Sequence, residues 1–435
     1  MCGIAGIITI KNSKIDSTVV ENVKRSLEHR GPDHSSHQFI KESVCLIHTR
    51  LSIIDLNDRS NQPFQSNDER YTIVFNGEIY NYKELRKELE TKGHKFITNG
   101  DTEVLLQGYI EYEEKILNKL RGQFAFVIYD KITNELFMAR DRIGIKPLYY
   151  SVNDNWILFG SEIKAIELSK LIEFEPDIDS YLAYLRHLCV PADSTGNKNI
   201  KKLEPGQFIR IDKNGKISKK IYWDPFTFSV NHDLNEKNVV EELDRLLNES
   251  VEYRKVSDVE VGLFLSGGLD SSLLGKLMKK NSDSSLKAFN VDFEENFEGY
   301  RGELKEARYA SSEIGINLNE EKINFDNFKE IFDNYAYYQD DLVGDEVGIP
   351  LYFLGKSSRS SGIKVVLVGE GSDELFYGYD HWNRLLKLSK YKKPYSSTKN
   401  KFSKLSNHRL NLLSNMLTGS TTFAGGALGF NLAEI

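Results

Sequence analysis

The chain has 435 residues, 40% hydrophobic and 28% charged, with a formal net charge of −7. At roughly 150 residues per domain, this length predicts two or three domains. The acidic balance gives no general reason to expect nucleic-acid binding, and no stretch approaches the roughly 18 apolar residues that cross a bilayer. Cys2, Cys45 and Cys189 are too few for a disulfide framework and fit a reducing compartment. Since no signal peptide is recognisable, we expect a cytoplasmic protein.

Residues 1 to about 165 contain short segments of alternating or continuous apolar character, which predict strands. These segments are Val44–His48, Tyr71–Phe75, Phe124–Tyr129, Glu135–Ala139, Leu148–Ser151 and Trp156–Gly160. Helical periodicity appears between them, at Ser17–Glu28, Tyr82–Lys92 and Thr102–Tyr112. The pattern predicts an α+β sandwich of antiparallel sheets covered by helices.

A polar stretch at Asn231–Asn238 follows a hairpin-like segment at Gly206–Lys220 and predicts a linker. Beyond it, strands and helices alternate. The expected elements are a helix around Val240–Val251, strands at Val259–Leu265, Ala288–Phe293 and Ile363–Val368, and helices from about Ser271, near Glu303–Ile314 and near Phe325–Gln339. Such alternation predicts an α/β doubly wound parallel sheet. We therefore expect domains at 1–220 and 239–435, joined by a linker at 221–238.

Cys2 becomes the first residue if the initiator Met1 is removed. Its thiol, with a reference pKa of about 8.5, and its α-amine, at about 7.7–8.0, then lie on one residue. Such a pair supplies a nucleophile and a proton acceptor without a separate histidine. A cysteine near a terminus is more often a small buried hydrophobe, so Cys2 alone decides nothing.

Other residues could complete a site for an amide substrate with an amino-acid head. Arg50 is a candidate partner for the α-carboxylate, and Asp101 for the α-ammonium. The side chain of Asn76 and the N–H of Gly77 could stabilise an oxyanion. The structural alternatives are a surface ion pair at Arg50 and an ordinary turn at Asn76–Gly77.

Five segments in this order resemble class II glutamine amidotransferases: Met1–Gly6, His29–Asp33, Arg50–Ile53, Asn76–Asn81 and Gly100–Glu103. The resemblance implies an N-terminal-nucleophile hydrolase sandwich (αββα), with Cys2, Asn76 and Gly77 as catalytic residues. It implies a glutamine site formed by Arg50, Leu51, Ser52, Ile53, Ile54, Asn76, Gly77, Glu78 and Asp101. Arg140–Tyr150 and Ser161–Ala165 continue the resemblance, and we give them structural roles.

The segment Val261–Leu265 reads as a buried strand that leads into Ser266–Ser272 and then a helix. Glycines let successive N–H groups and the helix N-terminus form a nest for a phosphate, and the serine hydroxyls add donors. The Gly-Lys-Ser/Thr ending of a Walker loop is absent. The structural alternative is a flexible serine–glycine turn.

A second loop follows the strand Val365–Val368. Its carboxylates lie where ligands of open α/β sheets bind, so Asp373 with Asp270 could hold Mg²⁺ on a pyrophosphate. Glu370 could orient an acyl-adenylate or ammonia. An acidic helix start, stabilised by the helix dipole, is the structural alternative.

Together the two loops resemble the ATP pyrophosphatase domain of asparagine synthetases. The resemblance implies that glutamine is hydrolysed at Cys2, that ammonia travels inside the protein, and that a carboxylate activated as its AMP ester is amidated, with aspartate as the leading acceptor. It implies that Glu370 is catalytic and that Asp270 and Asp373 bind Mg²⁺. The ATP site implied is Leu265, Ser266, Gly267, Gly268, Asp270, Ser271, Ser272, Val291, Val368 and Gly369.

Some features depart from the family. Its members normally continue into a helical C-terminal half, so we expect a truncated second domain, with a glutaminase whose synthetase half is inactive as an alternative. Gln339–Leu342 and Tyr377 differ from the usual pattern, so another carboxylate, such as an acidic sugar of a surface polysaccharide, is an alternative acceptor. The partners expected are glutamine, ATP and the acceptor, with a homodimer as a candidate assembly and neither nucleic acid nor membrane.

Overall fold

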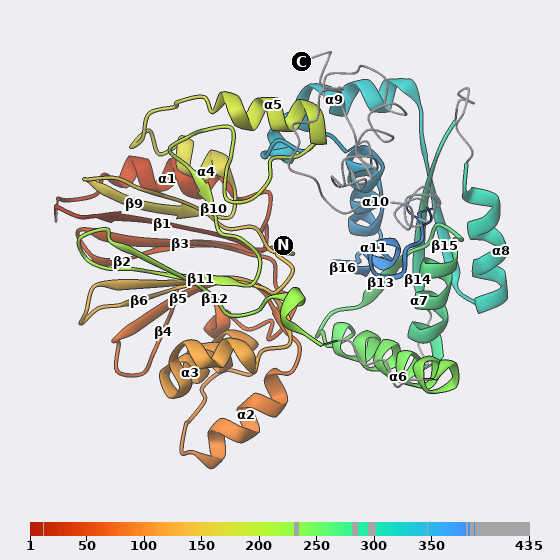
Figure 1. Cartoon of the computed structure of the whole chain (residues 1–435), viewed down its shortest axis with the longest axis horizontal. Coiled ribbons are helices and arrows are strands. Elements are labelled where there is room, and N and C mark those ends of the chain that lie inside the picture. Colours follow the sequence, from red (N-terminus) through yellow and green to blue (C-terminus); the bar gives the residue numbers. More distant parts are fainter. Residues whose placement is uncertain are drawn as a thin grey trace, which may run out of the picture. The chain divides into compact units, whose positions relative to one another are not determined.

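The computed structural model describes residues 1–11, 13–229, 235–280, 286–294, 302–345 and 347–379, with Trp382 and Lys387 in addition. The chain forms two compact units (Figure 1). The first comprises Met1–Pro176 and Ala192–Glu260, and the second comprises Asp177–Pro191 and the described residues from Val261 onward. Residues 230–234 of the expected linker lie outside the described residues. The domain bounds 1–220 and 239–435 stay a prediction, since a compact unit and a domain need not coincide along the chain.

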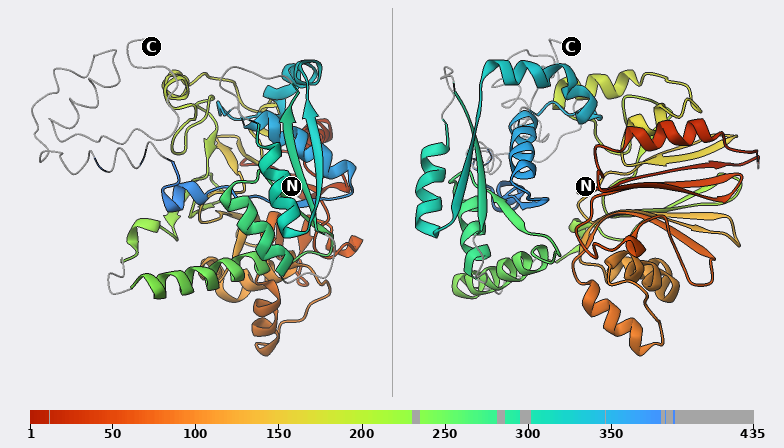
Figure 2. Two further views of the ribbon diagram at one scale, coloured as in Figure 1. Left: turned by 90° about the vertical axis from the view of Figure 1, so that its right-hand side faces the viewer. Right: turned by 180° about the vertical axis from the view of Figure 1, so that it is seen from behind.

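Two six-stranded antiparallel sheets form the body of the first unit (Figures 1 and 2). The first sheet has the order β10-β8-β9-β1-β3-β2, formed by Lys201–Lys202, Tyr149–Val152, Trp156–Gly160, Gly3–Thr9, Val44–Arg50 and His34–Lys41. The second has the order β12-β11-β7-β6-β5-β4, formed by Ile217–Ile221, Gln207–Ile211, Glu135–Arg140, Gly122–Asp130, Tyr71–Ile79 and Phe64–Gln65. Antiparallel pairing of neighbouring strands agrees with the short alternating segments of the sequence.

Helices cover the outer face of each sheet, so the first unit has four layers. Helices α1 (Ser17–Ser26) and α4 (Ile163–Glu167) pack against each other beside the first sheet, and α2 (Tyr82–Thr91) and α3 (Asp101–Tyr112) pack beside the second. The layer between the sheets is apolar, and Leu46, Val127 and Met138 belong to one buried cluster there. Short 3-10 helices lie at Asp58–Ser60, Glu113–Asn118 and Pro225–Thr227, and α6 spans Glu236–Arg254. The expected αββα sandwich is confirmed.

A four-stranded parallel sheet forms the centre of the second unit, in the order β15-β14-β13-β16. These strands are Asn317–Ile323, Lys287–Phe293, Val261–Phe264 and Val365–Leu367. The helices are α5 (Ile178–His187), α7 (Leu269–Lys280), α8 (Leu304–Ile314), α9 (Phe325–Gln339), α10 (Gly348–Ser360) and α11 (Ser372–Phe376). The chain runs from β13 outward to β15 and then returns to β16 on the other side of β13, with α8 and α10 on opposite faces of the sheet (Figures 1 and 2). The expected doubly wound parallel sheet is confirmed.

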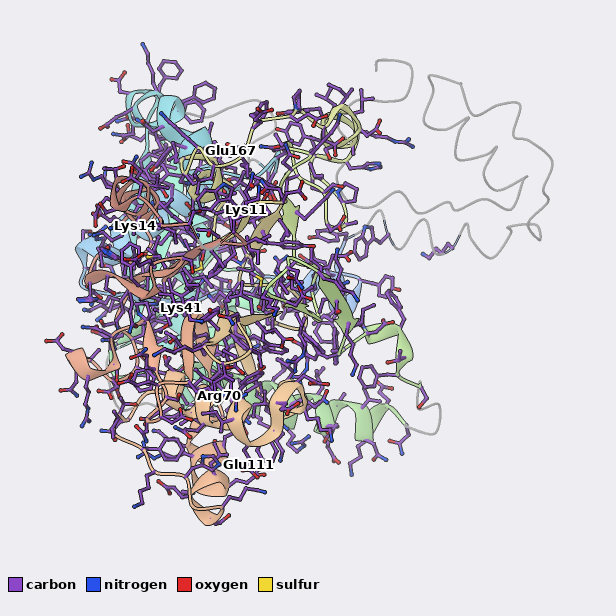
Figure 3. The ribbon with its side chains drawn as sticks, turned by 90° about the vertical axis from the view of Figure 1, so that its left-hand side faces the viewer. Lys11, Lys14, Lys41, Arg70, Glu111 and Glu167 are labelled. Carbon is purple, nitrogen blue, oxygen red and sulfur yellow. The ribbon has the colours of Figure 1, made fainter. Side chains whose placement is uncertain are left out.

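Charged side chains of both signs line the face of the first unit that Figure 3 shows, among them Lys41, Arg70 and Glu111. Arg70 pairs with Asp130 at 2.7 Å, and Glu111 pairs with Lys92 at 2.8 Å. Pairs at the surface contribute about 0–1 kcal/mol each, so the apolar layers supply most of the stability of this unit. Within the described ranges, none of the helices combines the length and the apolar composition that crossing a bilayer would need.

The fold predicts a strong difference between two glycine-to-alanine variants. Gly31 is buried, and a Cβ there would overlap the backbone of Thr49 and Arg50 at the end of β3. Because backbone cannot yield easily, we expect Gly31→Ala to lower the free energy of unfolding by about 1–3 kcal/mol in urea titrations. At the exposed Gly355 in α10 a Cβ would meet nothing within 4 Å. Gly355→Ala should therefore raise the free energy of unfolding by about 0.5–1 kcal/mol. Equal stability of the two variants would contradict this packing.

Candidate functional site

Cys2 lies directly before β1 and has a half-buried side chain. Its Sγ donates to the carbonyl oxygen of Leu51 at 3.7 Å and accepts from the Leu51 N–H at 3.4 Å. Arg30 Nε donates to the Cys2 carbonyl oxygen at 3.0 Å, and Arg30 Nη1 donates to Glu162 at 2.8 Å. Both the backbone and the thiol of Cys2 are therefore held in place by segments distant in sequence.

A small cavity of about 30 Å³ opens beside this thiol. It is lined by Cys2, Arg50, Leu51, Ile53, Ile54, Ser60, Gln62, Phe75, Gly77, Glu78, Gly100, Asp101 and Thr102. The residues expected to bind glutamine are thus brought together, except for Ser52 and Asn76, which do not line it. A volume of this size corresponds to a few water molecules.

Asn76 lies inside β5, where it pairs with Ala125 of β6, and Gly77 pairs with Phe124. The alternative of a simple turn at Asn76–Gly77 is therefore wrong. Asn76 is 1% exposed, and both Oδ1 and Nδ2 lack hydrogen-bond partners among the described residues. A buried amide without partners costs about 1–3 kcal/mol, so its retention is typical of a ligand site.

Arg50 ends β3 and is 5% exposed, so the alternative of a surface ion pair is wrong. Its Nη1 donates to the carbonyl oxygen of Asn57 at 3.0 Å and to Asn61 Oδ1 at 2.7 Å. Its Nη2 donates to the carbonyl oxygens of Ile54, at 3.3 Å, and of Asp55. Four of its N–H groups therefore shape the loop after β3. Only Nε has no partner within the described part of the chain and is available to a ligand.

Glu78 and Asp101 bring two carboxyl groups into the same cavity. Asp101 Oδ2 accepts from the Ile79 N–H at 2.9 Å, whereas Glu78 Oε2 is buried with no partner among the described residues. Burial, reinforced by the neighbouring charge of Asp101, raises the pKa of Glu78 well above its ordinary range. Burial also raises the pKa of Asp101 to about 6. The pair can accept a cation, which would relieve the repulsion.

The sequence alone did not identify Arg30 and Glu162 as neighbours of Cys2. Glu162 also accepts from His29 at 3.0 Å and pairs with Lys164 at 2.6 Å. Although burial opposes it, hydrogen bonds from His29 and the charge of Arg30 hold the pKa of Glu162 at about 2. Both residues lie in family segments, but a separation of 132 residues leaves no local signal that they pair.

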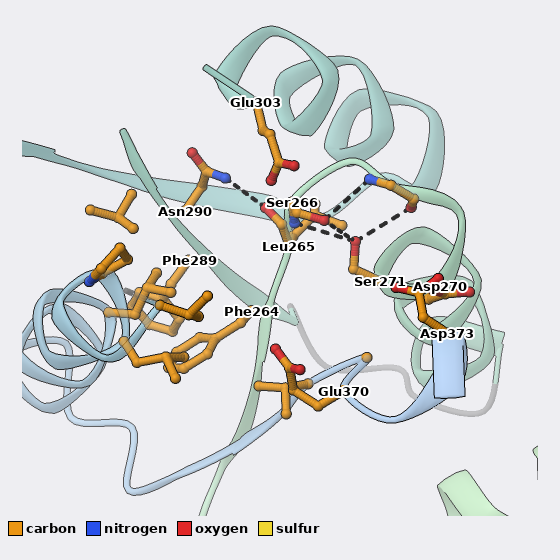
Figure 4. Close-up of a pocket in the computed structure, with 18 of the residues that line it drawn as sticks. Phe264, Leu265, Ser266, Asp270, Ser271, Phe289, Asn290, Glu303, Glu370 and Asp373 are labelled. Carbon is orange, nitrogen blue, oxygen red and sulfur yellow. Dashed lines mark hydrogen bonds between the residues drawn. The ribbon is translucent and has the colours of Figure 1, made fainter. Parts of the chain in front are cut away.

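In the second unit a cavity of about 420 Å³ lies where β13 and β16 end (Figure 4). This is the point at which the strand order reverses, and ligands of doubly wound sheets bind there. Of the residues expected to bind ATP, those that line it are Leu265, Ser266, Gly268, Asp270, Ser271, Val291, Val368 and Gly369. Gly267 and Ser272 do not line it, whereas Glu370 and Asp373 do.

The turn before α7 is fixed by hydrogen bonds and close packing. The hydroxyls of Ser266 and Ser271 lie 3.0 Å apart, and the Gly268 N–H donates to Ser266 Oγ at 3.2 Å. Gly267 has a φ of +84°, and a Cβ there would overlap the backbone of α8. The turn therefore has one defined shape, with hydroxyls and the start of α7 at the cavity.

Asp270 and Asp373 lie side by side at one end of this cavity (Figure 4). Burial, with the charge of Asp373 added, raises the pKa of Asp270. No group of three or more His, Cys, Asp or Glu residues suited to a metal ion occurs in the described ranges. One or two carboxylates are nevertheless the usual protein contribution to a Mg²⁺–nucleotide site.

Both units match known domain families. Residues 1–223 match the family described as a glutamine amidotransferase domain, and residues 242–424 match asparagine synthase. The chain is 37% identical over 396 residues to asparagine synthetase (glutamine-hydrolyzing) 1 of Bacillus subtilis, covering 90% of this chain and 61% of that protein. It is 34% identical to putative asparagine synthetase (glutamine-hydrolyzing) 2 of Methanocaldococcus jannaschii, covering 87% and 76%. A Gibberella zeae protein named Amidase chry2 is 33% identical, covering 87% and 60%.

These matches place the chain in a class of two-domain proteins, in which a glutamine amidotransferase domain is followed by an asparagine synthase domain. The chain belongs to the family of glutamine-hydrolysing asparagine synthetases. The family resemblance expected from the sequence is confirmed. The chain spans 61% and 58% of the first two curated relatives that it matches.

The raised pKa of Asp101 predicts how stability changes with pH. The pKa of Asp101 is about 6 in the folded protein and about 3.9 in an unfolded chain. Ionisation of Asp101 therefore lowers the free energy of unfolding as pH rises from 4 to 6, and the full loss is present at pH 7. Asp101→Asn removes the charge and keeps an acceptor for the Ile79 N–H. We expect a gain of about 1–3 kcal/mol in the free energy of unfolding at pH 7 and none at pH 4, measured by urea titration.

Asp55 provides a matched control of opposite sign. Although burial opposes it, hydrogen bonds from Asn57 and Ser60 lower its pKa to about 2. Its stabilising charge is therefore present above about pH 4 and is lost as pH falls toward 2. Asp55→Asn should destabilise the protein at pH 7. If Asp101→Asn lowered the free energy of unfolding at pH 7 as much as Asp55→Asn does, the conclusion that the buried carboxyl of Asp101 destabilises the fold would be wrong.

Proposed function

We propose that this protein is a glutamine-dependent and ATP-dependent amidotransferase that amidates a carboxylate. The leading reaction is conversion of L-aspartate to L-asparagine, with release of AMP and pyrophosphate. One observation carries the proposal. The same chain holds a thiol cavity lined by Glu78, whose buried Oε2 has no partner among the described residues, and a second cavity where a serine–glycine turn lies beside two carboxylates. The first feature fits an amide donor and the second fits a nucleotide, so a reaction that uses both substrates explains why one chain has both.

In the proposed glutaminase step, removal of Met1 leaves thiol and amine on Cys2. The α-amine of Cys2 is then proposed to accept the thiol proton. Burial lowers the pKa of the Met1 amine beside it to about 6, which supports a site where a neutral amine is favoured. The thiolate attacks the side-chain carbonyl carbon of glutamine. Asn76 Nδ2 and the Gly77 N–H would stabilise the oxyanion. Ammonia leaves with the returned proton, and water then hydrolyses the thioester to glutamate.

Glutamine binding is proposed to use the opposite charges of the cavity. The free Nε of Arg50 would donate to the α-carboxylate, while Glu78 and Asp101 would accept from the α-ammonium. Backbone from Leu51 to Ile54, including Ser52, would close over the ligand. The cation would also lower the cost of ionising both acids.

In the proposed synthetase step, the nest at Ser266–Ser272 binds the phosphates of ATP, and Leu265, Val291, Val368 and Gly369 surround the nucleoside. The paired oxygen ligands of Asp270 and Asp373 fit Mg²⁺, which would neutralise charge on the pyrophosphate leaving group. Glu370 lies in the same cavity and is proposed to orient the acyl-adenylate or ammonia.

The acceptor is the open part of the proposal. A relative of similar identity is named an amidase, which favours a second candidate, amidation of a carboxylate other than aspartate. A glutaminase with an inactive synthetase half is a further alternative. Because the reaction consumes glutamine and ATP, we propose the cytoplasm as its location. The homodimer stays a prediction.

The test is a panel of carboxylates, including aspartate and acidic sugars, supplied with glutamine, Mg²⁺ and ATP. We expect pyrophosphate, AMP and glutamate in equal amounts with one acceptor. Glutamate without pyrophosphate for every acceptor would favour the glutaminase alternative. No glutamate and no pyrophosphate would refute the proposed activity.

Removal of the proposed nucleophile should separate the two steps. We expect Cys2→Ala to lower glutamine-dependent pyrophosphate release by on the order of 10³-fold, while release driven by ammonium chloride persists. The exposed Cys189 offers a matched control, because Cys189→Ala also removes a free thiol but should leave both rates unchanged. A Cys2→Ala protein that still consumed glutamine at the normal rate would show that the nucleophile lies elsewhere.

A further inference from the structure

The loop that follows β3 borders the cavity beside Cys2 and is held by a distant part of the chain. Ile53 and Ile54 of this loop line the cavity. The Asp258 N–H donates to the carbonyl oxygen of Ile53 at 3.0 Å, and Asp258 Oδ2 accepts from the Asp55 N–H at 2.8 Å. A single residue, 203 positions after Asp55, therefore holds the backbone on both sides of Ile54.

Asp55 is the residue of this loop whose backbone depends most on its partners. It has a φ of +47°, in the left-handed region that a residue with a side chain seldom adopts. Its carbonyl oxygen accepts from Arg50 Nη2, and its carboxylate accepts from the Ser60 hydroxyl and the Asn99 N–H, both at 2.7 Å. Its own N–H is bound by Asp258. Loss of the Asp258 carboxylate therefore removes one of the constraints that fix the loop.

The segment that carries Asp258 is itself anchored on the first unit. Val256 packs against the same apolar cluster as Ile53. In the last turn of α6, the guanidinium of Arg254 lies 5.6 Å from the centre of the Tyr80 ring, within the range of a cation–π contact. Although Asp258 is exposed, these contacts and its own N–H fix where its carboxylate lies.

Asp258 lies outside the part of the chain that matches a glutamine amidotransferase domain. That match covers residues 1–223, whereas Asp258 falls in the asparagine synthase match at 242–424. The compact first unit nevertheless extends to Glu260, so Asp258 belongs with the glutamine loop by its contacts. Strand β13, which leads to the turn at Ser266–Ser272, begins three residues later at Val261. The glutamine loop thus depends on a residue that the first family match does not include.

We propose that Asp258 is a positioning residue for the glutamine site, and that it acts by accepting the Asp55 N–H and so holding Ile53 and Ile54 in place. The inference rests on the proposed function in one respect, that the cavity beside Cys2 binds glutamine. Asp258 does not line that cavity. It therefore affects the binding of glutamine and not the attack of the thiol.

The first experiment removes the acceptor with Asp258→Ala in the full chain. We expect KM for glutamine, measured by glutamate release, to rise about 3- to 10-fold, as for the loss of one hydrogen bond, with kcat within about twofold of wild type. In the Cys2→Ala background, calorimetry should show glutamine binding weakened by the same factor. An unchanged KM, or a fall in kcat alone, would overturn the inference. Wild-type protein that releases no glutamate would instead refute the proposed function.

The second experiment separates the hydrogen bond from the charge. Asp258→Asn keeps an oxygen that can accept from the Asp55 N–H, so its KM should lie within about twofold of the wild-type value. Asp244→Ala is the matched control, because it removes the same charge from an exposed position of α6 in the same family match. Its KM should equal that of wild type. If Asp258→Asn raised KM as much as Asp258→Ala, the charge and not the hydrogen bond would matter, and the inference would be wrong.

Discussion

The pairing of β1 between β3 and β9 is the constraint on which the first site depends. All seven residues of β1 are buried, and its register sets Gly3 opposite Thr49. Cys2 therefore lies beside the end of β3, in contact with Leu51, and the strand register fixes its position along the sheet. Because a slip of one residue would reverse every side chain of β1, the buried layers on both faces fix the position of the thiol.

In the second unit the corresponding constraint is topological. Parallel pairing of β13 with both β14 and β16 makes the chain reverse direction across the sheet, so the loops after β13 and β16 diverge and leave space between them. Segments about a hundred residues apart thereby supply Asp270 and Asp373 to one cavity. The parallel sheet explains the separation in sequence, and the strand order explains the proximity in space.

Much of this architecture could be predicted because the signals were local. The predicted helix Tyr82–Lys92 differs from the observed one, Tyr82–Thr91, by one residue. The turn after Val261–Phe264 is predictable because its glycines and serines follow the strand directly in sequence. Strand β15 was missed because Asn317–Ile323 is largely polar, as befits a strand at the edge of the sheet. The contact of Arg30 with Glu162 depends on long-range pairing, which no local pattern encodes.

Unpartnered buried polar atoms connect the two sites and provide an argument independent of family membership. Glu78 in the lining of one cavity, Asn76 next to Gly77 of the same lining, and Asn290 in the lining of the other retain such atoms within the described chain. Each costs about 1–3 kcal/mol, a substantial fraction of the 5–15 kcal/mol that stabilises a typical domain. Apolar side chains of similar size would cost less at these positions. In the proposed function, the amide and the ammonium of glutamine would supply partners for the polar atoms of the first site.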